Sequence, residues 1–297
     1  MDTPGISDIH LEDAYDYCEQ ITRNEARNFY YAFITLPMRK KRAIYTAYAF
    51  CRRCDDAVDN NESTTEKKRL LDEIENNLKS GINLDKLILE NNPIILATCA
   101  IIKEFNIPQQ YFFDVIQGVR MDIEFTSFNS FDEVKEYCYK VASVIGLICI
   151  KIFGYSNPKA IDYAIDFGLA MQLTNILRDI LDDLNENRCY LAFEEMDKFN
   201  YSINQLRESL YNDDFIQMMK FEVDRAKRYF ESGSRLLPLV DTDSRICLVI
   251  LSTIYSKILK KIERSNYNIF QTNYRLNTFE KLSIMGFTWL RYKITKK

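Results

Sequence analysis

Residues 172–190 read QLTNILRDILDDLNENRCY. Its polar side chains recur every three or four residues, so a helix would place them on one side. The rest of the circumference is apolar, which is typical of a helix buried in a protein core. We therefore expect a buried helix whose polar stripe faces an internal cavity, and this stripe consists of Gln172, Asn175, Asp179, Asp183 and Glu186.

A second acidic stripe lies in the segment YAFCRRCDDAVD at residues 48–59, near the end of a helix that we expect to begin near residue 39. Intervals of four, three and four residues bring to one helix face Tyr48, Arg52, Asp55 and Asp59. Carboxylates one turn apart repel each other, and they do so more strongly when they lose contact with water. We expect Arg52 to supply part of the compensating charge and a divalent cation to supply the rest.

Both stripes offer oxygen ligands without His or Cys, which favours a hard cation such as Mg²⁺. Because Mg²⁺ prefers one or two carboxylates plus substrate phosphates, the two stripes predict a diphosphate held between metal-bearing helices. Arg178 and Arg188 lie beside the second stripe and, like Arg52, are placed to bind phosphate oxygens.

Each acidic motif also has a simpler interpretation. A single D-x-x-D pattern at a helix end is more often a solvated terminus, and Asp122 is as often an ordinary surface residue as a ligand. Two stripes on separate helices, each with an Arg inside the repeat, favour the metal site.

Composition favours one all-α domain over residues 1–297. Only 8 Gly and 6 Pro are present and they are scattered, so there is no linker and little of the turn chemistry of a β protein. Helical periodicity with its breaks predicts about nine or ten helices. Ser130 and Glu133 have the spacing of a capping box that starts one of them, and the charged segment 62–92 predicts a solvated outer helix.

The aromatic content of 13% fits either an ordinary core or a large apolar pocket. The net charge of −4 lacks the basic footprint of a nucleic-acid-binding protein. The eight Cys lie mostly in apolar helical stretches, which predicts reduced, buried thiols; for the lone C-x-x-C of Cys51 and Cys54 we expect helix packing rather than zinc.

The N-terminal residues show no basic or apolar region of a secretory signal, so we expect a cytoplasmic protein. The longest uncharged apolar run, Val141–Ile150, is shorter than the roughly 20 residues that a membrane-spanning helix needs.

Five segments together resemble the squalene/phytoene synthases, over about residues 12 to 290. They are Phe29–Phe33, Tyr45–Asp59, Tyr137–Ala142 with Gly146, Gln172–Asp179 and Arg188–Leu191. The resemblance implies a single all-α isoprenoid (terpenoid) synthase domain, with a central cavity between two Asp-rich helices.

The same resemblance implies roles for individual residues. The metal ligands would be Asp55, Asp59, Asp122, Asp179 and Asp183. The metal would be Mg²⁺, with Mn²⁺ as the alternative. The catalytic residues would be Tyr48, Arg52, Tyr137, Arg178, Tyr190 and Tyr255. The substrate would be bound by Asn28, Phe29, Phe33, Gln172, Asn175, Arg188 and Arg275. Two positions depart from the family pattern: Asn28 stands where many members have Ser, and Arg275 alone remains of an expected Arg pair.

The activity implied is head-to-head condensation of two farnesyl or two geranylgeranyl diphosphates through a cyclopropylcarbinyl diphosphate, which gives a squalene-type or phytoene product. The sequence leaves the chain length and the use of NADPH open. The alternatives are a head-to-tail prenyltransferase or terpene cyclase, and a non-catalytic assembly or scaffold protein. Residues 287–297 are aromatic and basic, and they form either a plain C-terminal helix or a peripheral contact with the inner face of a membrane, where the product leaves.

Overall fold

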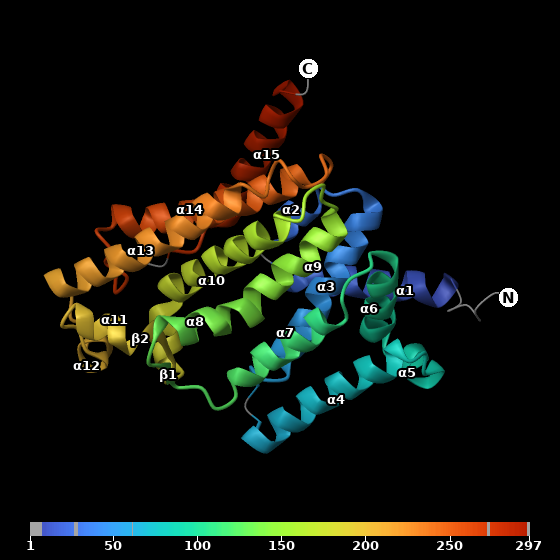
Figure 1. Ribbon diagram of the computed structural model, residues 1–297, viewed down its shortest axis with the longest axis horizontal. Coiled ribbons are helices and arrows are strands. Elements are labelled where there is room, and N and C mark those ends of the chain that lie inside the picture. The colour runs from blue at the N-terminus through green and yellow to red at the C-terminus, as the bar shows by residue number, and fades with distance from the viewer. Residues whose placement is uncertain (1–7, 27–28, 61, 272–273, 296–297) are drawn as a thin grey trace.

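The long helix α10 (Ala160–Asn185) occupies the centre of the molecule (Figure 1). This computed structural model describes residues 8–26, 29–60, 62–271 and 274–295. On one side α10 packs against α13 (Asp213–Ser234) and α14 (Arg245–Arg264), and on the other against α9 (Val144–Phe153) and the π-helical segment Tyr139–Ser143. The apolar side chains of Leu173, Ile176, Leu177 and Ile180 are buried in these contacts, which confirms the predicted buried helix.

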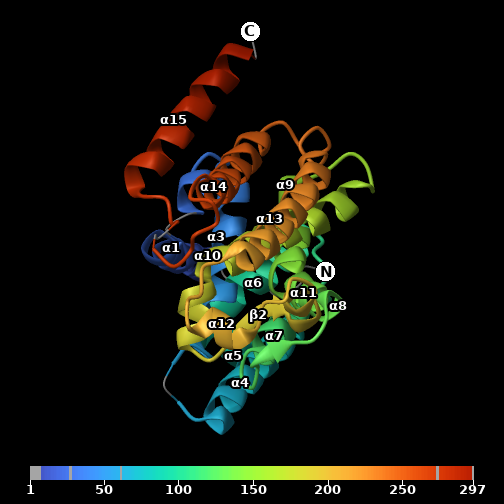
Figure 2. The same ribbon diagram turned by 90° about the vertical axis from the view of Figure 1, so that its left-hand side faces the viewer.

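The other elements surround this centre. The first half of the chain forms α1 (Asp8–Glu25), α2 (Tyr30–Phe33), α3 (Met38–Asp56), α4 (Thr64–Ile82), α5 (Lys86–Asn91), α6 (Pro93–Glu104) and α7 (Gln110–Met121). The second half adds β1 (Ser127–Phe128), α8 (Phe131–Cys138), β2 (Cys189–Ala192), α11 (Phe193–Lys198), α12 (Ile203–Arg207) and α15 (Thr278–Thr295). A second view shows α15 directed away from the body (Figure 2).

The predicted all-α class is confirmed, but two details of the prediction were wrong. The described residues form fifteen α-helices rather than nine or ten, because α2, α5, α11 and α12 have only four to six residues and are too short to show a period. The parallel strands β1 and β2 were not predicted, because their pairing is long-range and their alternation is too short to read. The capping box is confirmed: Ser130 and Glu133 bond to each other's backbone N–H at the start of α8.

A close approach between α10 and the π-helical segment fixes the wall of the central cavity. A Cβ added at Gly168 would lie 2.6 Å from the Cα of Ser143, so only glycine permits this spacing. The Ser143 hydroxyl donates a hydrogen bond of 2.8 Å to the carbonyl of Ile165. The π-helical segment is therefore held firmly against α10.

Lys40 of α3 joins the ends of two other helices. Its side chain is buried, with the residue 9% exposed, and its Nζ donates to the Phe153 carbonyl at the end of α9 (2.7 Å). The same Nζ lies 3.0 Å from Asp241 and 2.7 Å from Asp243, just before α14. Because Phe153 also lines the cavity, this ammonium group holds one end of the cavity in place.

Replacement of Lys40 by Met should lower the free energy of unfolding by about 2–3 kcal/mol, because the Phe153 carbonyl loses its charged donor. Urea unfolding measures this change. The matched control is Lys68→Met, which breaks an exposed ion pair with Glu124 and should cost below about 0.5 kcal/mol. Equal losses of unfolding free energy in the two variants would show that the buried Lys40 ammonium group contributes no more stability than an exposed ion pair.

Candidate active site

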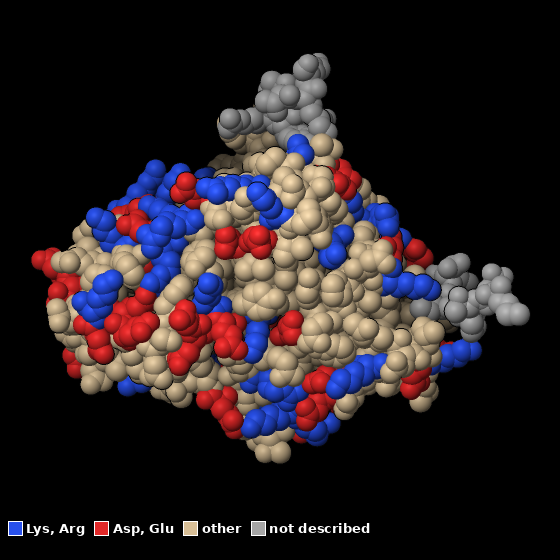
Figure 3. All heavy atoms as spheres, in the orientation of Figure 1, with Lys and Arg blue, Asp and Glu red and all other residues tan. Residues whose placement is uncertain are grey.

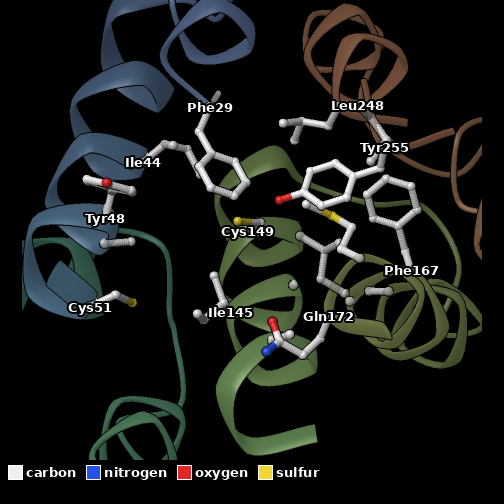
Figure 4. A pocket seen from close by; sticks show the side chains of 18 of the residues that line it. Phe29, Ile44, Tyr48, Cys51, Ile145, Cys149, Phe167, Gln172, Leu248 and Tyr255 are labelled. Atoms are coloured by element: carbon white, nitrogen blue, oxygen red, sulfur yellow. The ribbon is translucent and has the colours of Figure 1, made fainter. Parts of the chain in front are cut away.

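A largely apolar cavity of about 300 Å³ lies between α2, α3, α9, α10 and α14 (Figure 4). Residues of α3, α9 and α10 follow one another along its length. Asp55 and Asn175 are the last lining residues toward the C-terminal ends of α3 and α10, and Gln172 lies one turn before Asn175. The cavity therefore has one polar end, while the side chains along its walls are those of Phe29, Phe33, Ile145, Cys149, Phe153 and Leu248.

Four of the aromatic residues that line this cavity form one continuous group. Phe29 stacks on Phe33 with ring centroids 5.8 Å apart, and it lies 6.3 Å from both Tyr48 and Tyr255. In Figure 4 the Tyr255 hydroxyl points into the cavity from α14. Seven of the predicted site residues thus line the cavity: Phe29, Phe33, Tyr48, Asp55, Gln172, Asn175 and Tyr255. Asn28 lies outside the described residues.

The first acidic stripe ends at the polar end of the cavity. Asp55 is in the last turn of α3. Asp59 lies in the turn that follows, and its backbone N–H donates a hydrogen bond of 2.9 Å to the Asp55 carbonyl. Burial, with a contribution from the Asp59 charge, raises the pKa of Asp55 to about 7. The guanidinium of Arg52 is directed instead to Asp56, at 2.7 Å, so the carboxylates of this stripe are only partly compensated.

Asp122 is held by two tyrosines. The hydroxyls of Tyr190 and Tyr137 donate to its two carboxylate oxygens over 2.8 Å and 3.2 Å, and the two rings stack with centroids 5.1 Å apart. Burial raises the pKa of Asp122 to about 6. Tyr137 and Tyr190, which the resemblance implies to be catalytic residues, are not among the residues that line the cavity. In this structure they orient Asp122.

The second stripe carries arginine partners. Asp179 pairs with the neighbouring Arg178, and the guanidinium of Arg275 lies 3.3 Å from Asp179 and 2.8 Å from Asp182. Burial, and then the charge of Asp179, raises the pKa of Asp183 to about 7. Arg275, which precedes α15 in the sequence, thus lies against α10, almost a hundred positions earlier in the chain.

Arg188 lies where the two stripes meet. Burial raises the pKa values of Asp59, Asp122 and Asp183, and the positive charge of Arg188 partly lowers all three. Arg188 is therefore close to carboxylates of both stripes. The negative charge of Asp122 contributes to the raised pKa of Asp55. Charge interactions therefore link the two stripes and Asp122, and Asp55 is the member of this group that lines the cavity.

The donor set fits a hard cation. No group of three His, Cys, Asp or Glu side chains encloses an ion within the part of the chain that the structure describes. The buried Oδ1 of Asn175, however, has no hydrogen-bond partner among the described residues, so it is free to accept a ligand. Burial raises the pKa of the nearby Cys51 thiol well above its usual range, which leaves oxygen atoms as the available ligands. Such a set suits Mg²⁺ when phosphate oxygens complete the shell.

Several lining residues were not predicted from the sequence. Cys149, Phe153, Phe167, Met171 and Leu248 face the cavity from three helices. Their only signal in the sequence is apolar periodicity, which does not distinguish a cavity wall from a packed core.

The buried carboxylates should make the metal-free protein less stable as the pH rises. A pKa near 7 in the folded state, against an ordinary value of 3.8, means that Asp55 favours folding below pH 4 and loses this contribution as the pH rises to 7. Asp55→Asn should therefore raise the free energy of unfolding at pH 8 by about 1–2 kcal/mol, and much less at pH 5. Urea unfolding in EDTA measures this; the exposed Asp16→Asn serves as control, and an equal gain at both pH values would contradict the assignment.

The comparisons agree with this geometry. The family model for squalene/phytoene synthase matches residues 22–280. The chain is 34% identical to the 15-cis-phytoene synthase of Synechocystis over 96% of this chain and 87% of that protein, and 34% identical to the phytoene synthase of Mycobacterium tuberculosis over 92% and 90%. A crystal structure of a dehydrosqualene synthase, 28% identical, superposes with a TM-score of 0.84 over 96% of this chain and 98% of that one.

The helical fold and its central cavity define a protein with the terpenoid synthase fold. More narrowly, the chain belongs to the squalene/phytoene synthase family, and it is a prenyltransferase of this type. None of the described helices is both long and apolar enough to cross a membrane.

Proposed function

We propose that this protein condenses two geranylgeranyl diphosphates head to head and releases phytoene and diphosphate. The observation that carries the proposal is the cavity, which is apolar along its length and bordered at one end by the Asp55 carboxylate of α3 and by the amides of Gln172 and Asn175 of α10. Such a shape suits a molecule with a long hydrocarbon chain and one highly charged end. The choice of phytoene rests on the two phytoene synthases that are 34% identical over nearly the whole chain.

The residues around the polar end would bind and activate the diphosphate groups. Mg²⁺, held by Asp55, Asp59, Asp122, Asp179 and Asp183, would neutralise the diphosphate and so make it a better leaving group. Arg178 and Arg275 now pair with carboxylates of α10, and Arg188 pairs with Glu186. These guanidinium groups would exchange carboxylate for phosphate oxygens when the substrate enters.

The aromatic residues would protect the cationic stages of the reaction. Loss of the first diphosphate leaves an allylic cation, which the faces of Phe29, Tyr48 and Tyr255 stabilise. The double bond of the second substrate attacks this cation, and loss of a proton gives the cyclopropylcarbinyl diphosphate. The second diphosphate then leaves, the skeleton rearranges, and loss of another proton gives phytoene without a reductant. The apolar walls exclude the water that would quench these cations.

A second candidate substrate is farnesyl diphosphate, because the 28% identical structure is a dehydrosqualene synthase. Squalene formation would require a hydride from NADPH, whereas dehydrosqualene formation would not. The non-catalytic alternative is disfavoured, because all five candidate metal carboxylates are present and one of them, Asp55, lines the polar end of the cavity.

A product assay with each substrate tests the proposal. Purified protein with Mg²⁺ should convert geranylgeranyl diphosphate to phytoene, with or without NADPH, as identified by mass spectrometry of the extract. A thirty-carbon product from farnesyl diphosphate alone would replace the proposed substrate and keep the reaction type. Absence of product from both would refute the condensation.

Asp179→Asn tests the metal site. Removal of this charge should lower kcat at least about a hundredfold, because the metal–diphosphate contacts act mainly in the transition state. The matched control is Asp182→Asn, which removes a more exposed carboxylate of the same helix and should change kcat by less than about threefold. Similar losses of kcat in both variants would indicate a general effect of negative charge on this helix. An unchanged kcat in Asp179→Asn would exclude Asp179 as a metal ligand.

We also propose a peripheral position at a membrane. The products considered above are hydrocarbons, and a lipid phase is the natural acceptor for a molecule with so little affinity for water.

A further inference from the structure

Within the part of the chain that the structure describes, helix α15 (Thr278–Thr295) is attached to the body near its beginning. It contacts α14 and α2, and Lys261 of α14 forms an ion pair of 2.8 Å with Glu280 in its first turn. Beyond this attachment α15 extends away from the other helices in both views (Figures 1 and 2). Much of its surface therefore has no partner among the described residues.

The two sides of α15 differ in burial. Lys281 and Ile284 are buried against the body. At 100° per residue, the opposite side carries four large apolar residues, Phe279, Leu282, Phe287 and Leu290, which we call the outer stripe. All four are exposed, Phe279 to 79%, Phe287 to 68% and Leu290 to 54%. Gly286 lies within the outer stripe, and a Cβ added there would meet no atom within 4 Å.

Positive charge lies on α14, near the start of the outer stripe. Lys257, Lys260 and Arg264 are exposed on α14, the helix to which α15 is attached, and the charge of Lys257 reaches Glu280 and helps to lower the pKa of that carboxylate. We call these three residues the basic flank. In Figure 3 Lys and Arg side chains gather over α13 and α14. In sequence, residues 281–297 contain five Lys or Arg and no Asp or Glu, although the whole chain has a net charge of −4.

We propose that the outer stripe and the basic flank together bind the surface of an anionic lipid bilayer. An apolar stripe bordered by cations is the pattern of a helix that lies in the membrane interface: the apolar side chains enter the acyl boundary and the cations meet the headgroups. A second copy of the chain fits this surface less well. A two-fold symmetric contact would bring the basic flanks of both copies toward each other, and like charges oppose that contact.

This inference gives the proposed peripheral position a defined surface. Helix α15 contacts α2, whose Phe33 lines the cavity, so the membrane-binding helix adjoins the cavity wall. Only the use of this surface for product release rests on the proposed function. Binding to lipid is measured without substrate, so failure of the condensation and failure of membrane binding give separate results.

The test is flotation of the full chain with vesicles. Vesicles of phosphatidylcholine mixed with phosphatidylglycerol should bind the protein, and vesicles of phosphatidylcholine alone should bind it much more weakly. The double variant Phe287→Ser/Leu290→Ser should bind the mixed vesicles at least about tenfold more weakly, because it loses the apolar part of the stripe. Lys257→Gln/Lys260→Gln should lose about fivefold per cation, and this loss should shrink at high salt.

The matched control is Leu84→Ser/Leu87→Ser, which removes two exposed leucines near α5 and should leave binding unchanged; Leu87 is 70% exposed. Circular dichroism checks that each variant is folded. Equal binding by the outer-stripe variant and the control would overturn the proposal, as would failure of the unmodified chain to bind anionic vesicles. Dimerisation in sedimentation velocity, lost in the Phe287→Ser/Leu290→Ser variant while vesicle binding persists, would assign the surface to a second copy instead.

Discussion

The constraint on which this structure depends is the burial of carboxylates at one end of an apolar cavity. Asp55, Asp122 and Asp183 all have raised pKa values because they are removed from water. A protein keeps such groups at a cost in stability, and most readily where their charge serves a function. The surrounding helices hold these carboxylates near one another, and the cations that offset them are few.

The same burial strengthens the interactions of charged groups at this end of the cavity. Three arginines contact carboxylates of the second stripe or lie between the stripes, so a diphosphate would meet guanidinium groups as well as carboxylates. The apolar walls keep water away from this site, which strengthens every electrostatic contact within it. The close packing of α10 at Gly168 and the ammonium group of Lys40 keep these walls in place.

Much of the site could be predicted from the sequence, because helical spacing alone decides which side chains share a face. Spacing therefore singled out Asp55 and Asn175, which both line the cavity, and the motif contexts identified the family. Residue spacing along a helix does not reveal side-chain rotamers or contacts between residues that are far apart in the sequence. For this reason the outward direction of Arg52, the Tyr137 and Tyr190 contacts with Asp122 and the short strands became visible only in the structure. The cavity wall was equally hidden, because Phe153 and Leu248 have the same pattern as ordinary core residues.

The most direct test of this account is calorimetric titration of the metal-free protein with inorganic diphosphate at pH 7, with and without Mg²⁺, in two buffers of different ionisation enthalpy. The account predicts that diphosphate binds tightly only with Mg²⁺ and that binding releases about one proton, because Asp55 and Asp183 must ionise to act as ligands. Binding that is independent of Mg²⁺, or that shows the same heat in both buffers, would contradict it.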